Sequence, residues 1–282
     1  MRVLHLDSGR EMRGGQWQVL RLMEGLAAAG VENTLLARLD GPLLTAARAR
    51  GLSAEPLGVV RALGATRRHD LVHAHDAHTH SLGLLLAPRP LVVSRRVAFP
   101  VRSRWKYSRP RLYLAISGLI RQVLIDGGVP AEKIRVVYDG VPLLGPSQGS
   151  QVLGLEKDFS LLAGLGVKVA VRLEEEIAGA GIFVYLTASE GLGSGALLAM
   201  SAGVPVIASN VGGLREVIRH GENGLLVENQ EATIRGAIQQ LIDNPDEARR
   251  LGAEARRTVQ ERFTIGAMVN GTLASYGELL RQ

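Results

Sequence analysis

The stretch "IFVYLTASEGLGSGALLAMSAGVPVIA", Ile182 to Ala208, decides the fold that this sequence predicts. An apolar run, Ile182–Thr187, leads into a glycine-rich turn, a helical pattern covers Gly195–Ala202, and a second apolar run covers Val204–Ala208. Short apolar runs separated by a helix are typical of parallel strands buried on both faces. The stretch therefore predicts a doubly wound α/β unit, in which ligands bind outside the carboxyl ends of the strands.

The same alternation of apolar runs and helical patterns extends toward both termini. Runs of strand length in the first half cover Val3–Leu6, Asn33–Leu39, Leu71–Ala74, Leu91–Ser94, Leu112–Ile116 and Ile134–Tyr138. Helical patterns are clearest at Gln16–Ala29 and Gly118–Gly127, and later at segments starting near Gln230, after Asn244 and at Ile265. The Gly- and Pro-rich segment 138–151 interrupts the pattern and predicts a linker. We therefore expect Rossmann-like domains at 1–145 and 146–264, and a C-terminal helix at 265–282 that packs back on the first domain.

Composition limits the classes of function. The chain has 282 residues and no cysteine, which excludes disulfides and cysteine-based metal centres. A formal net charge of +6 favours anionic partners such as phosphates or anionic lipid headgroups. No apolar run approaches the roughly 18 residues of a membrane span, and the start "MRVLHLD" is typical of a strand. We expect a cytoplasmic protein.

Glu190 is the one acid of the glycine-rich turn "SEGLGSG", 189–195. Gly191, Gly193 and Gly195 precede or open the helical pattern, and backbone N–H groups there can point at sugar hydroxyls or phosphate. The carboxylate can accept hydrogen bonds from hydroxyls. A side chain eight residues further along a helix lies up to about 12 Å away, which suits the far end of a nucleotide sugar. That position is Leu198. The alternative is an ordinary strand–turn–helix connection.

A glycine pair, Gly14–Gly15, opens the first helical pattern. The sequence there does not match G-x-G-x-x-G, so the dinucleotide fingerprint is absent. Free N–H groups and the positive end of the helix dipole would still favour a phosphate. A plain turn explains the pair equally well.

The segment "HAHDAHTH", 73–80, follows a predicted strand and contains four histidines. Because the strand passes into a helix here, we expect the rings to diverge, and we predict no metal site. A polar patch at the strand end, with His75 or Asp76 touching substrate, is the functional interpretation. Structural histidines are the alternative.

The segment "SRRVAFPVRSRWKYSRPR", 94–111, has seven Lys or Arg residues, three aromatic residues and no acid. This composition favours an anionic membrane surface or a phosphate-bearing acceptor, and the alternative is a solvated loop. No nucleic-acid motif is present, so we expect no nucleic-acid partner.

Taken together, these stretches resemble the family-4 glycosyltransferases, which are retaining enzymes of the GT-B fold. The segments that carry the resemblance are "RGGQWQVLRLMEGLAAAG", "DLVHAHDAHTH", "VPAEKIRVVYDGVP" and "IFVYLTASEGLGSGALLAMSAGVPVIASNVGGLREVIRHGENGLLV". The resemblance implies two Rossmann-like domains facing each other across a cleft. It also implies metal-independent, cofactor-free transfer of a sugar, hexosyl in type, from a nucleoside-diphosphate sugar to an unknown acceptor such as a lipid-linked molecule or a glycan. The basic segment 94–111 would place the enzyme peripherally at the inner membrane face.

The resemblance also assigns roles to residues. Glu190 and Lys157 would be the catalytic pair, with Lys157 as the phosphate-binding lysine. The donor would contact Gly14, Gly15, Gln16, Lys157, Glu190, Gly191, Leu192, Gly193, Ser194 and position 198. The acceptor-side candidates are His75, Asp76, Arg95 and Arg96.

The sequence departs from the family pattern at several positions. Leu198 replaces the second acid of the donor site, and the loss of one charge-assisted hydrogen bond would weaken donor binding by about tenfold to a hundredfold. Ser94, Arg95 and Arg96 stand where a strand-end histidine is expected, and the arginine before Lys157 is missing. The second domain is short between Lys157 and Glu174. Leu198 and the short segment favour one alternative, a non-catalytic sugar-nucleotide-binding protein of the same fold. A GT-B sugar-nucleotide epimerase is a further alternative.

Overall fold

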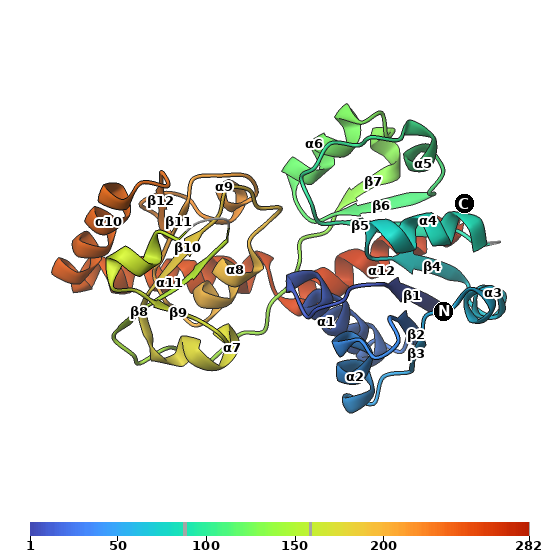
Figure 1. The fold of residues 1–282 in the computed structure, drawn as a ribbon, viewed down its shortest axis with the longest axis horizontal. Helices are drawn as coiled ribbons and strands as arrows, with labels where there is room; N and C mark the ends of the chain where they lie inside the picture. Colours follow the sequence, from blue (N-terminus) through green and yellow to red (C-terminus); the bar gives the residue numbers. More distant parts are fainter. Residues whose placement is uncertain (87–88, 158–159, 282) are drawn as a thin grey trace. The chain divides into compact units, whose positions relative to one another are not determined.

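A computed structural model of the chain describes residues 1–86, 89–157 and 160–281. The chain divides into two compact units (Figure 1). Unit 1 comprises Met1–Tyr138 together with Ile265–Gln282, and unit 2 comprises Asp139–Thr264. The unit boundary therefore falls seven residues before the predicted boundary at 145/146, and the C-terminal helix belongs to unit 1.

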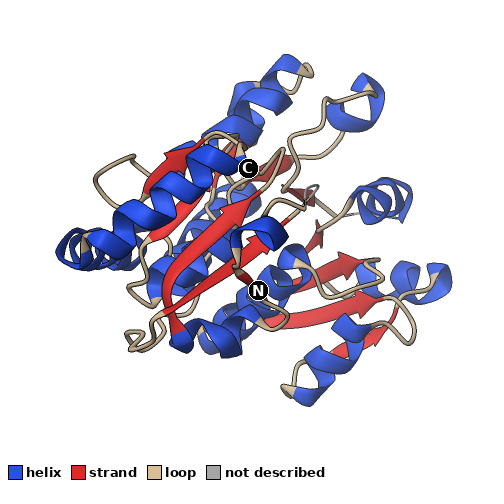
Figure 2. Cartoon of the chain, turned by 60° about the vertical axis from the view of Figure 1, so that its left-hand side comes forward, coloured by secondary structure: helices blue, strands red, loops and turns tan. Residues whose placement is uncertain are grey.

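Unit 1 contains a parallel sheet of seven strands in the order β3-β2-β1-β4-β5-β6-β7. The strands are β1 (Arg2–Asp7), β2 (Glu32–Ala37), β3 (Ala54–Pro56), β4 (Leu71–Ala74), β5 (Leu91–Arg95), β6 (Leu112–Ala115) and β7 (Ile134–Val136). The sheet connects through α1 (Gly14–Ala28), α2 (Pro42–Ala49), α3 (Val59–Thr66), α4 (Ala77–Leu86), α5 (Arg104–Ser108), α6 (Gly118–Asp126) and the short η1 (Ala131–Lys133). Helices cover both faces of the sheet, which confirms the predicted doubly wound class (Figure 2).

The C-terminal helix α12 (Ile265–Arg281) packs in unit 1 against α1 and the sheet. Its apolar residues Met268 and Tyr276 share a core cluster with Val3 and Leu22. The helices approach closely at Gly25, where an added Cβ would lie 2.4 Å from Cγ2 of Val269. A glycine at this helix crossing therefore lets residues distant in sequence complete the core of unit 1.

Unit 2 contains a parallel sheet of five strands in the order β12-β11-β10-β8-β9. The strands are β8 (Gln151–Glu156), β9 (Lys168–Val169), β10 (Ala180–Leu186), β11 (Val206–Ser209) and β12 (Leu225–Val227). The helices are η2 (Leu162–Leu165), α7 (Leu173–Glu176), η3 (Ile177–Gly179), α8 (Ser194–Ser201), α9 (Leu214–Val217), α10 (Glu231–Asp243) and α11 (Pro245–Arg262). One core cluster lies between the sheet and α10 and includes Val184, Ile207 and Leu241.

Unit 2 is short where the sequence departs from the family pattern. From residue 160 to residue 179 the chain forms only η2, the two-residue edge strand β9, α7 and η3. Residues 158–159, which precede that segment, lie outside the described part. The sheet of unit 2 therefore has five strands, against seven in unit 1.

The predicted linker 138–151 is wrong from Asp139 onward, because this segment packs on unit 2. Val141 is buried and its N–H donates to the carbonyl of Phe263 at 2.9 Å. The N–H of Ser147 donates to the carbonyl of Ala202 at the same distance. These hydrogen bonds join residues that are far apart in sequence. The packing of this segment on unit 2 therefore leaves no local pattern in the sequence.

Among the described residues, the structure contains no helix that combines the length and the apolar character needed to cross a membrane.

Candidate active site

Lys157 and Glu190 meet at the carboxyl ends of two neighbouring strands of unit 2. The last residues of β8 and β10, Glu156 and Leu186, are paired in the sheet. Lys157 follows β8 directly, and its N–H donates to the carbonyl of Leu186 at 2.8 Å. Its Nζ lies 2.8 Å from Oε2 of Glu190. The parallel register therefore brings together two residues that stand 33 positions apart in sequence.

Tyr185, a residue that no sequence motif indicated, completes this group. Its hydroxyl donates to Oε2 of Glu190 at 2.5 Å, and its ring centroid lies 5.3 Å from Nζ of Lys157. The other oxygen of Glu190, Oε1, accepts from the N–H of Gly191 at 3.0 Å. The Glu190 side chain is 15% exposed and that of Lys157 is 50% exposed. The carboxylate is thus held in one orientation while one edge of the group remains open to solvent.

The backbone after Glu190 is packed against a second glycine loop, residues 212–213. The N–H of Gly213 donates to the carbonyl of Glu190 at 2.9 Å. A Cβ on Gly213 would lie 2.0 Å from the carbonyl oxygen of Gly191, so only glycine fits there. Gly193 has a φ of +104°, in the left-handed region that favours glycine. This packing fixes the loop that leads into α8.

The N-terminus of α8 presents unused donors. Within the described part of the chain, the N–H groups of Leu192, Gly193 and Ser194 donate to no protein acceptor. Orphan donors at a helix start, together with the helix dipole, favour oxygen-rich or anionic ligands. Leu198 lies one turn further along α8 and is buried, so no acid stands at this point of the helix.

In unit 1, the glycine pair Gly14–Gly15 forms the start of α1, as the sequence suggested. Gln16, predicted to bind the donor, uses its amide inside the loop. Its Nε2 donates to both carboxylate oxygens of Asp7 at 3.2 Å, and its Oε1 accepts from the N–H of Arg13 at 3.3 Å. Burial raises the pKa of Asp7. Gln16 therefore ties the start of α1 to the end of β1.

The four acceptor-side candidates have different surroundings. Asp76 accepts from Ser8 and from the N–H groups of His78 and Thr79, so it joins two loops and caps α4. Arg95 is buried and donates to the hydroxyl of Tyr107 at 2.9 Å and to the carbonyl of Phe99 at 2.5 Å. Only Arg96 and His75 lie together: Nη1 of Arg96 is 3.5 Å from Nδ1 of His75. A Cβ on Gly15 would lie 3.7 Å from Cδ of Arg96, so this pair also adjoins the start of α1.

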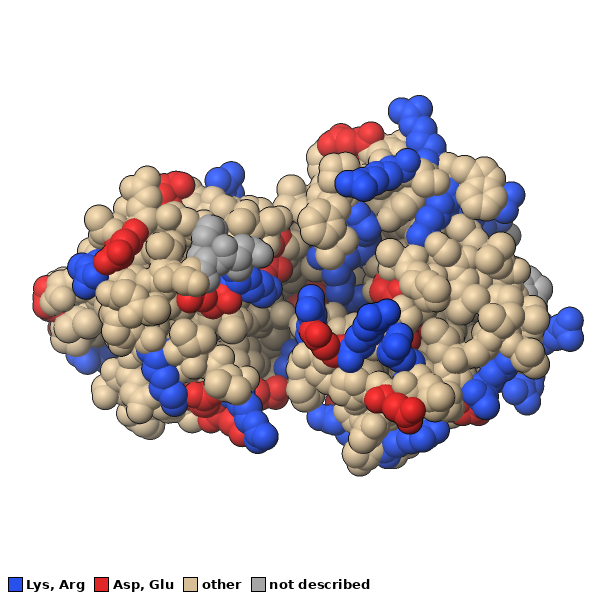
Figure 3. Space-filling model, viewed as in Figure 1, with Lys and Arg blue, Asp and Glu red and all other residues tan. Residues whose placement is uncertain are grey.

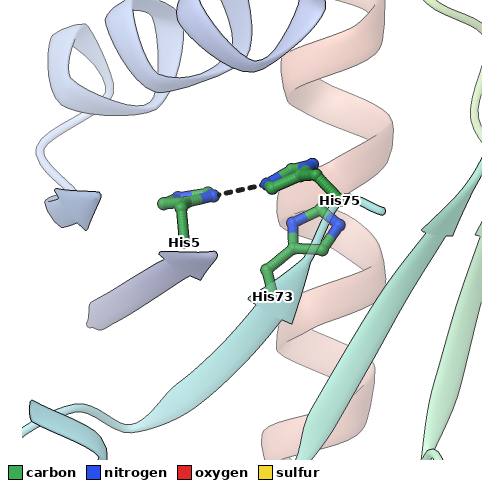
Figure 4. A group of neighbouring side chains, drawn as sticks. All are labelled: His5, His73 and His75. Carbon is green, nitrogen blue, oxygen red and sulfur yellow. Dashed lines mark hydrogen bonds between the residues drawn. The ribbon is translucent and has the colours of Figure 1, made fainter. Parts of the chain in front are cut away.

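The prediction that the histidine rings diverge is wrong for His73 and His75. These residues stand two positions apart at β4, so their side chains share one face of the sheet. His5 pairs with His73 in the sheet register and points to the same face. The three rings converge, with centroids of His73 and His75 4.0 Å apart (Figure 4). The strand period, and not the following helix, decides their direction.

This cluster is the one group of three metal-ligating side chains found among the described residues, with ligand atoms within 4.8 Å of one another. Every ring nitrogen nevertheless has a hydrogen-bond partner. His5 contacts His75 and Asn33, His73 contacts Tyr276 and Ser94, and His75 contacts His5 and Arg96. The guanidinium of Arg96 would also repel a cation. The donor set therefore fits a hydrogen-bonded network better than a metal centre.

Two family models match the chain along most of its length. Residues 12–143 match the model described as "Glycosyltransferase Family 4", and residues 155–258 match "Glycosyl transferases group 1". Together these matches cover the strands, glycine loops and helices that carry Gly14, Arg96, Lys157 and Glu190. The chain belongs to this glycosyltransferase family.

Curated proteins similar to the chain are longer than the chain. D-inositol 3-phosphate glycosyltransferase of Rhodococcus opacus (strain B4) is 34% identical over 157 residues, which are 52% of this chain and 34% of that protein. N-acetyl-alpha-D-glucosaminyl L-malate synthase of Bacillus anthracis is 34% identical over 150 residues, which are 53% of this chain and 38% of that protein. The chain thus spans about a third of the length of the curated relatives that it matches.

Solved structures show the same fold at low sequence identity. The crystal structure of Anabaena HepE in complex with UDP-glucose has a TM-score of 0.86 and 18% identity, covering 99% of this chain and 100% of that chain. Sucrose-phosphate synthase from Thermosynechococcus elongatus has a TM-score of 0.79 and 19% identity, covering 99% of each chain. The expected GT-B fold is therefore confirmed.

Proposed function

We propose that this glycosyltransferase moves a hexosyl group from a nucleoside-diphosphate sugar to an acceptor hydroxyl, without a metal and with retention of anomeric configuration. One observation carries the proposal: Glu190, Lys157 and the unused N–H groups of α8 converge at the carboxyl ends of β8 and β10. Ligands of such sheets bind at this edge. Membership of the family supports the reaction type.

The chemistry of the reaction explains why these groups are needed. The bond between the anomeric carbon and the diphosphate oxygen breaks, and a bond from that carbon to the acceptor oxygen forms. The acceptor proton leaves with the diphosphate or to solvent. Negative charge grows on the diphosphate, where Lys157 and the α8 N–H groups supply fixed donors. Glu190 accepts hydrogen bonds from sugar hydroxyls, and Tyr185 and Gly191 keep its carboxylate in place.

The relatives suggest which substrates to try first. HepE is described in complex with UDP-glucose, which supports a uridine-linked donor. The names of the two curated relatives specify acceptors with negative charge, an inositol phosphate and malate. Unit 1 places Arg96 at the end of its sheet, and we propose that the acceptor of this chain also carries an anionic group.

The test is a donor panel of UDP-glucose, UDP-N-acetylglucosamine, ADP-glucose and GDP-mannose, with D-inositol 3-phosphate, L-malate or water as acceptor. We expect nucleoside diphosphate release with at least one donor, undiminished by EDTA, and an α-linked product by NMR. Binding of a donor without release under any condition would contradict transfer and would favour a sugar-nucleotide-binding protein. Loss of release in EDTA would contradict metal independence, and a β-linked product would contradict retention.

We also propose that the segment 94–111 holds the protein at an anionic membrane surface, peripherally at its inner face. Phe99 and Trp105 are 69% and 62% exposed, and the guanidinium of Arg109 lies 4.4 Å from the Trp105 ring centroid. Arg102, Arg104, Arg109 and Arg111 form no ion pair with any described acid. Figure 3 shows Lys and Arg side chains at several places on the visible face of unit 1. Exposed aromatic rings between unpaired cations suit an anionic lipid interface.

Liposome co-sedimentation tests the membrane proposal. We expect binding to phosphatidylglycerol vesicles at low salt that weakens as salt screens the charges. The double variant Phe99→Ser/Trp105→Ser should lose most of this binding, since its anchoring rings are gone. The control is Val60→Ser on α3, where an apolar residue that is 84% exposed stands outside the segment. Absence of binding to anionic vesicles at low salt, or equal loss in both variants, would contradict the proposal.

A further inference from the structure

Buried and half-buried polar side chains form a continuous row across the sheet of unit 1 that ends at Arg96. Asn33 on β2 contacts His5 on β1, with 3.1 Å between Oδ1 and Nε2. Nδ1 of His5 lies 2.9 Å from Nε2 of His75, which follows β4 (Figure 4). Nδ1 of His75 then faces Nη1 of Arg96 at 3.5 Å. His5 and His75 are both buried, so this row is part of the interior and not a surface cluster.

Asn33 sets the direction of every hydrogen bond in the row. Its Nδ2 donates to the carbonyls of Val31 and Met23, at 3.1 Å and 3.3 Å, so its Oδ1 must face His5 as an acceptor. His5 therefore carries its proton on Nε2, and its Nδ1 accepts. His75 must then donate from Nε2, which leaves Nδ1 of His75 as an acceptor for Arg96. Only one arrangement of protons satisfies all of these contacts.

The ring of His73 packs against the ring of His75 and is itself fixed by two hydrogen bonds. Its Nδ1 lies 2.5 Å from the hydroxyl of Tyr276 on α12, and its Nε2 lies 2.8 Å from Oγ of Ser94 on β5. The ring of His75 contacts both His73 and His5, with centroid distances of 4.0 Å and 5.2 Å, and the centroids of His5 and His73 are 5.6 Å apart. His75 is thus unable to rotate without breaking several contacts. Its acceptor nitrogen keeps a fixed place beside Arg96.

The three histidines are neutral in this setting. Burial lowers the pKa of His5 to about 4, and burial together with neighbouring histidines and Arg96 holds the pKa of His73 and His75 well below the ordinary value. The titratable or charged groups around the row are His69, Tyr276, Asp7 and Arg96. A protonated Nδ1 on His75 would place a donor against the Arg96 guanidinium. Neutrality is therefore what allows Arg96 to remain at this position.

We propose that Asn33, His5 and His75 are positioning residues that hold the guanidinium of Arg96 beside Gly15, where Arg96 binds a phosphate group of a substrate. The inference rests on the proposed sugar transfer. The phosphate belongs either to the acceptor or to the diphosphate of the donor. Arg96 is the group that touches the ligand, and the row acts on the ligand only through Arg96.

A double-mutant cycle tests this dependence, with D-inositol 3-phosphate and UDP as probes in calorimetric titrations. Arg96→Gln should weaken binding of the probe that Arg96 contacts by about tenfold to a hundredfold, the effect of one charge-assisted bond. Weaker binding of D-inositol 3-phosphate would show that Arg96 binds the phosphate of the acceptor. Weaker binding of UDP would show that it binds the diphosphate of the donor. His5→Phe should weaken the same probe by about threefold to tenfold in the wild type and by less than about twofold when Arg96→Gln is present.

The matched control is His80→Phe, which removes another buried histidine of unit 1 outside the row and should leave both affinities unchanged. Equal losses from His5→Phe in both backgrounds would overturn the proposal, because they indicate a merely structural role. The proposal would also be overturned if the wild-type protein bound neither D-inositol 3-phosphate nor UDP. If the coupling is present but no donor is turned over, the row is supported and the proposed transfer fails.

Ring-nitrogen NMR of the wild-type protein provides a second test that needs no variant. We expect His5 and His75 as Nε2–H tautomers with no titration between pH 5 and pH 8. The opposite tautomer for either ring, an inflection near pH 6.5, or one equivalent of tightly bound zinc on these rings would overturn the proposal.

Discussion

Replacing Glu190 by glutamine should lower kcat/KM for sugar transfer by about a hundredfold, while the affinity for free UDP changes little. The carboxylate accepts from Lys157, Tyr185 and the N–H of Gly191. A glutamine amide would turn an N–H donor toward one of these donors and would accept more weakly from sugar hydroxyls. The loss of charge-assisted hydrogen bonds of this kind costs about 1.5–3 kcal/mol. The measurement is nucleoside diphosphate release under initial-rate conditions, together with calorimetric binding of UDP.

The control for this prediction is Glu222→Gln in the same unit. Glu222 is an exposed acid paired with Arg219, with 65% of its side chain accessible, and its loss removes the same charge away from the strand ends. Its rate should match the wild type. Equal rates for Glu190→Gln and the wild type would remove Glu190 from the sugar-binding role. Equal loss in both variants would show that net charge, and not the placed carboxylate, affects the rate.

Acidification from pH 6.5 to pH 4 should unfold unit 1, through its buried neutral histidines. Burial lowers the pKa of His5 and of His80 to about 4, and the pKa of His73 and His75 is held well below the ordinary value. In the unfolded chain each takes up a proton near pH 6.5, so the unfolded state binds more protons in this window. The free energy of unfolding is unaffected by these groups above pH 6.5 and falls as the pH drops toward 4.

The expected loss is large relative to the stability of a domain. For His5 and His80, a pKa lowered from 6.5 to about 4 corresponds to about 3 kcal/mol each, against a typical total of about 5–15 kcal/mol. The raised pKa of Asp7 acts in the opposite direction and offsets part of the loss. Both tryptophans, Trp17 and Trp105, lie in unit 1, so their fluorescence reports this unit alone. We expect a cooperative shift in their emission between pH 6 and pH 4.

A pair of neighbouring variants isolates the histidine contribution. His80→Phe retains an aromatic ring beside Tyr107 and Tyr113 but takes up no proton, so the acid midpoint should move to lower pH. His78→Gln removes an exposed histidine of the same helix and should leave the midpoint unchanged. Unchanged tryptophan emission down to pH 3.5 would contradict the prediction, and so would identical midpoints for the two variants.

Features that depend on local patterns, such as buried strands and glycine turns, can be predicted from the sequence. Apolar runs placed β1, β4, β5, β6 and β10 within one or two residues of their observed bounds, because buried strands must be apolar. The strand β8 and the short edge elements β3 and β9 were not anticipated, since they carry few apolar residues or follow irregular segments. Glu190 and the α8 turn were identifiable because glycine spacing is required by backbone geometry there.

The contacts of Tyr185 and of the row from Asn33 to Arg96 cannot be predicted from the sequence, for a different reason. Tyr185 is one more aromatic residue in a buried strand, and only the turn after β10 reveals that its hydroxyl reaches Glu190. The passage of the histidine segment into α4 predicts diverging rings, whereas the register of β1 against β4 aligns His5 with His73. No local pattern encodes such a register.

The sequence by itself determined the α/β class, the family, and the residue types at the strand ends, because burial and backbone geometry restrict those positions one at a time. Only the tertiary structure decided which of these residues act together. It joined Lys157 to Glu190 across paired strands and brought His75 to Arg96 beside α1. It also returned α12 to the core of unit 1. Each of these contacts joins parts of the chain that are distant in sequence, and their partners are selected by strand register and close packing over the whole unit.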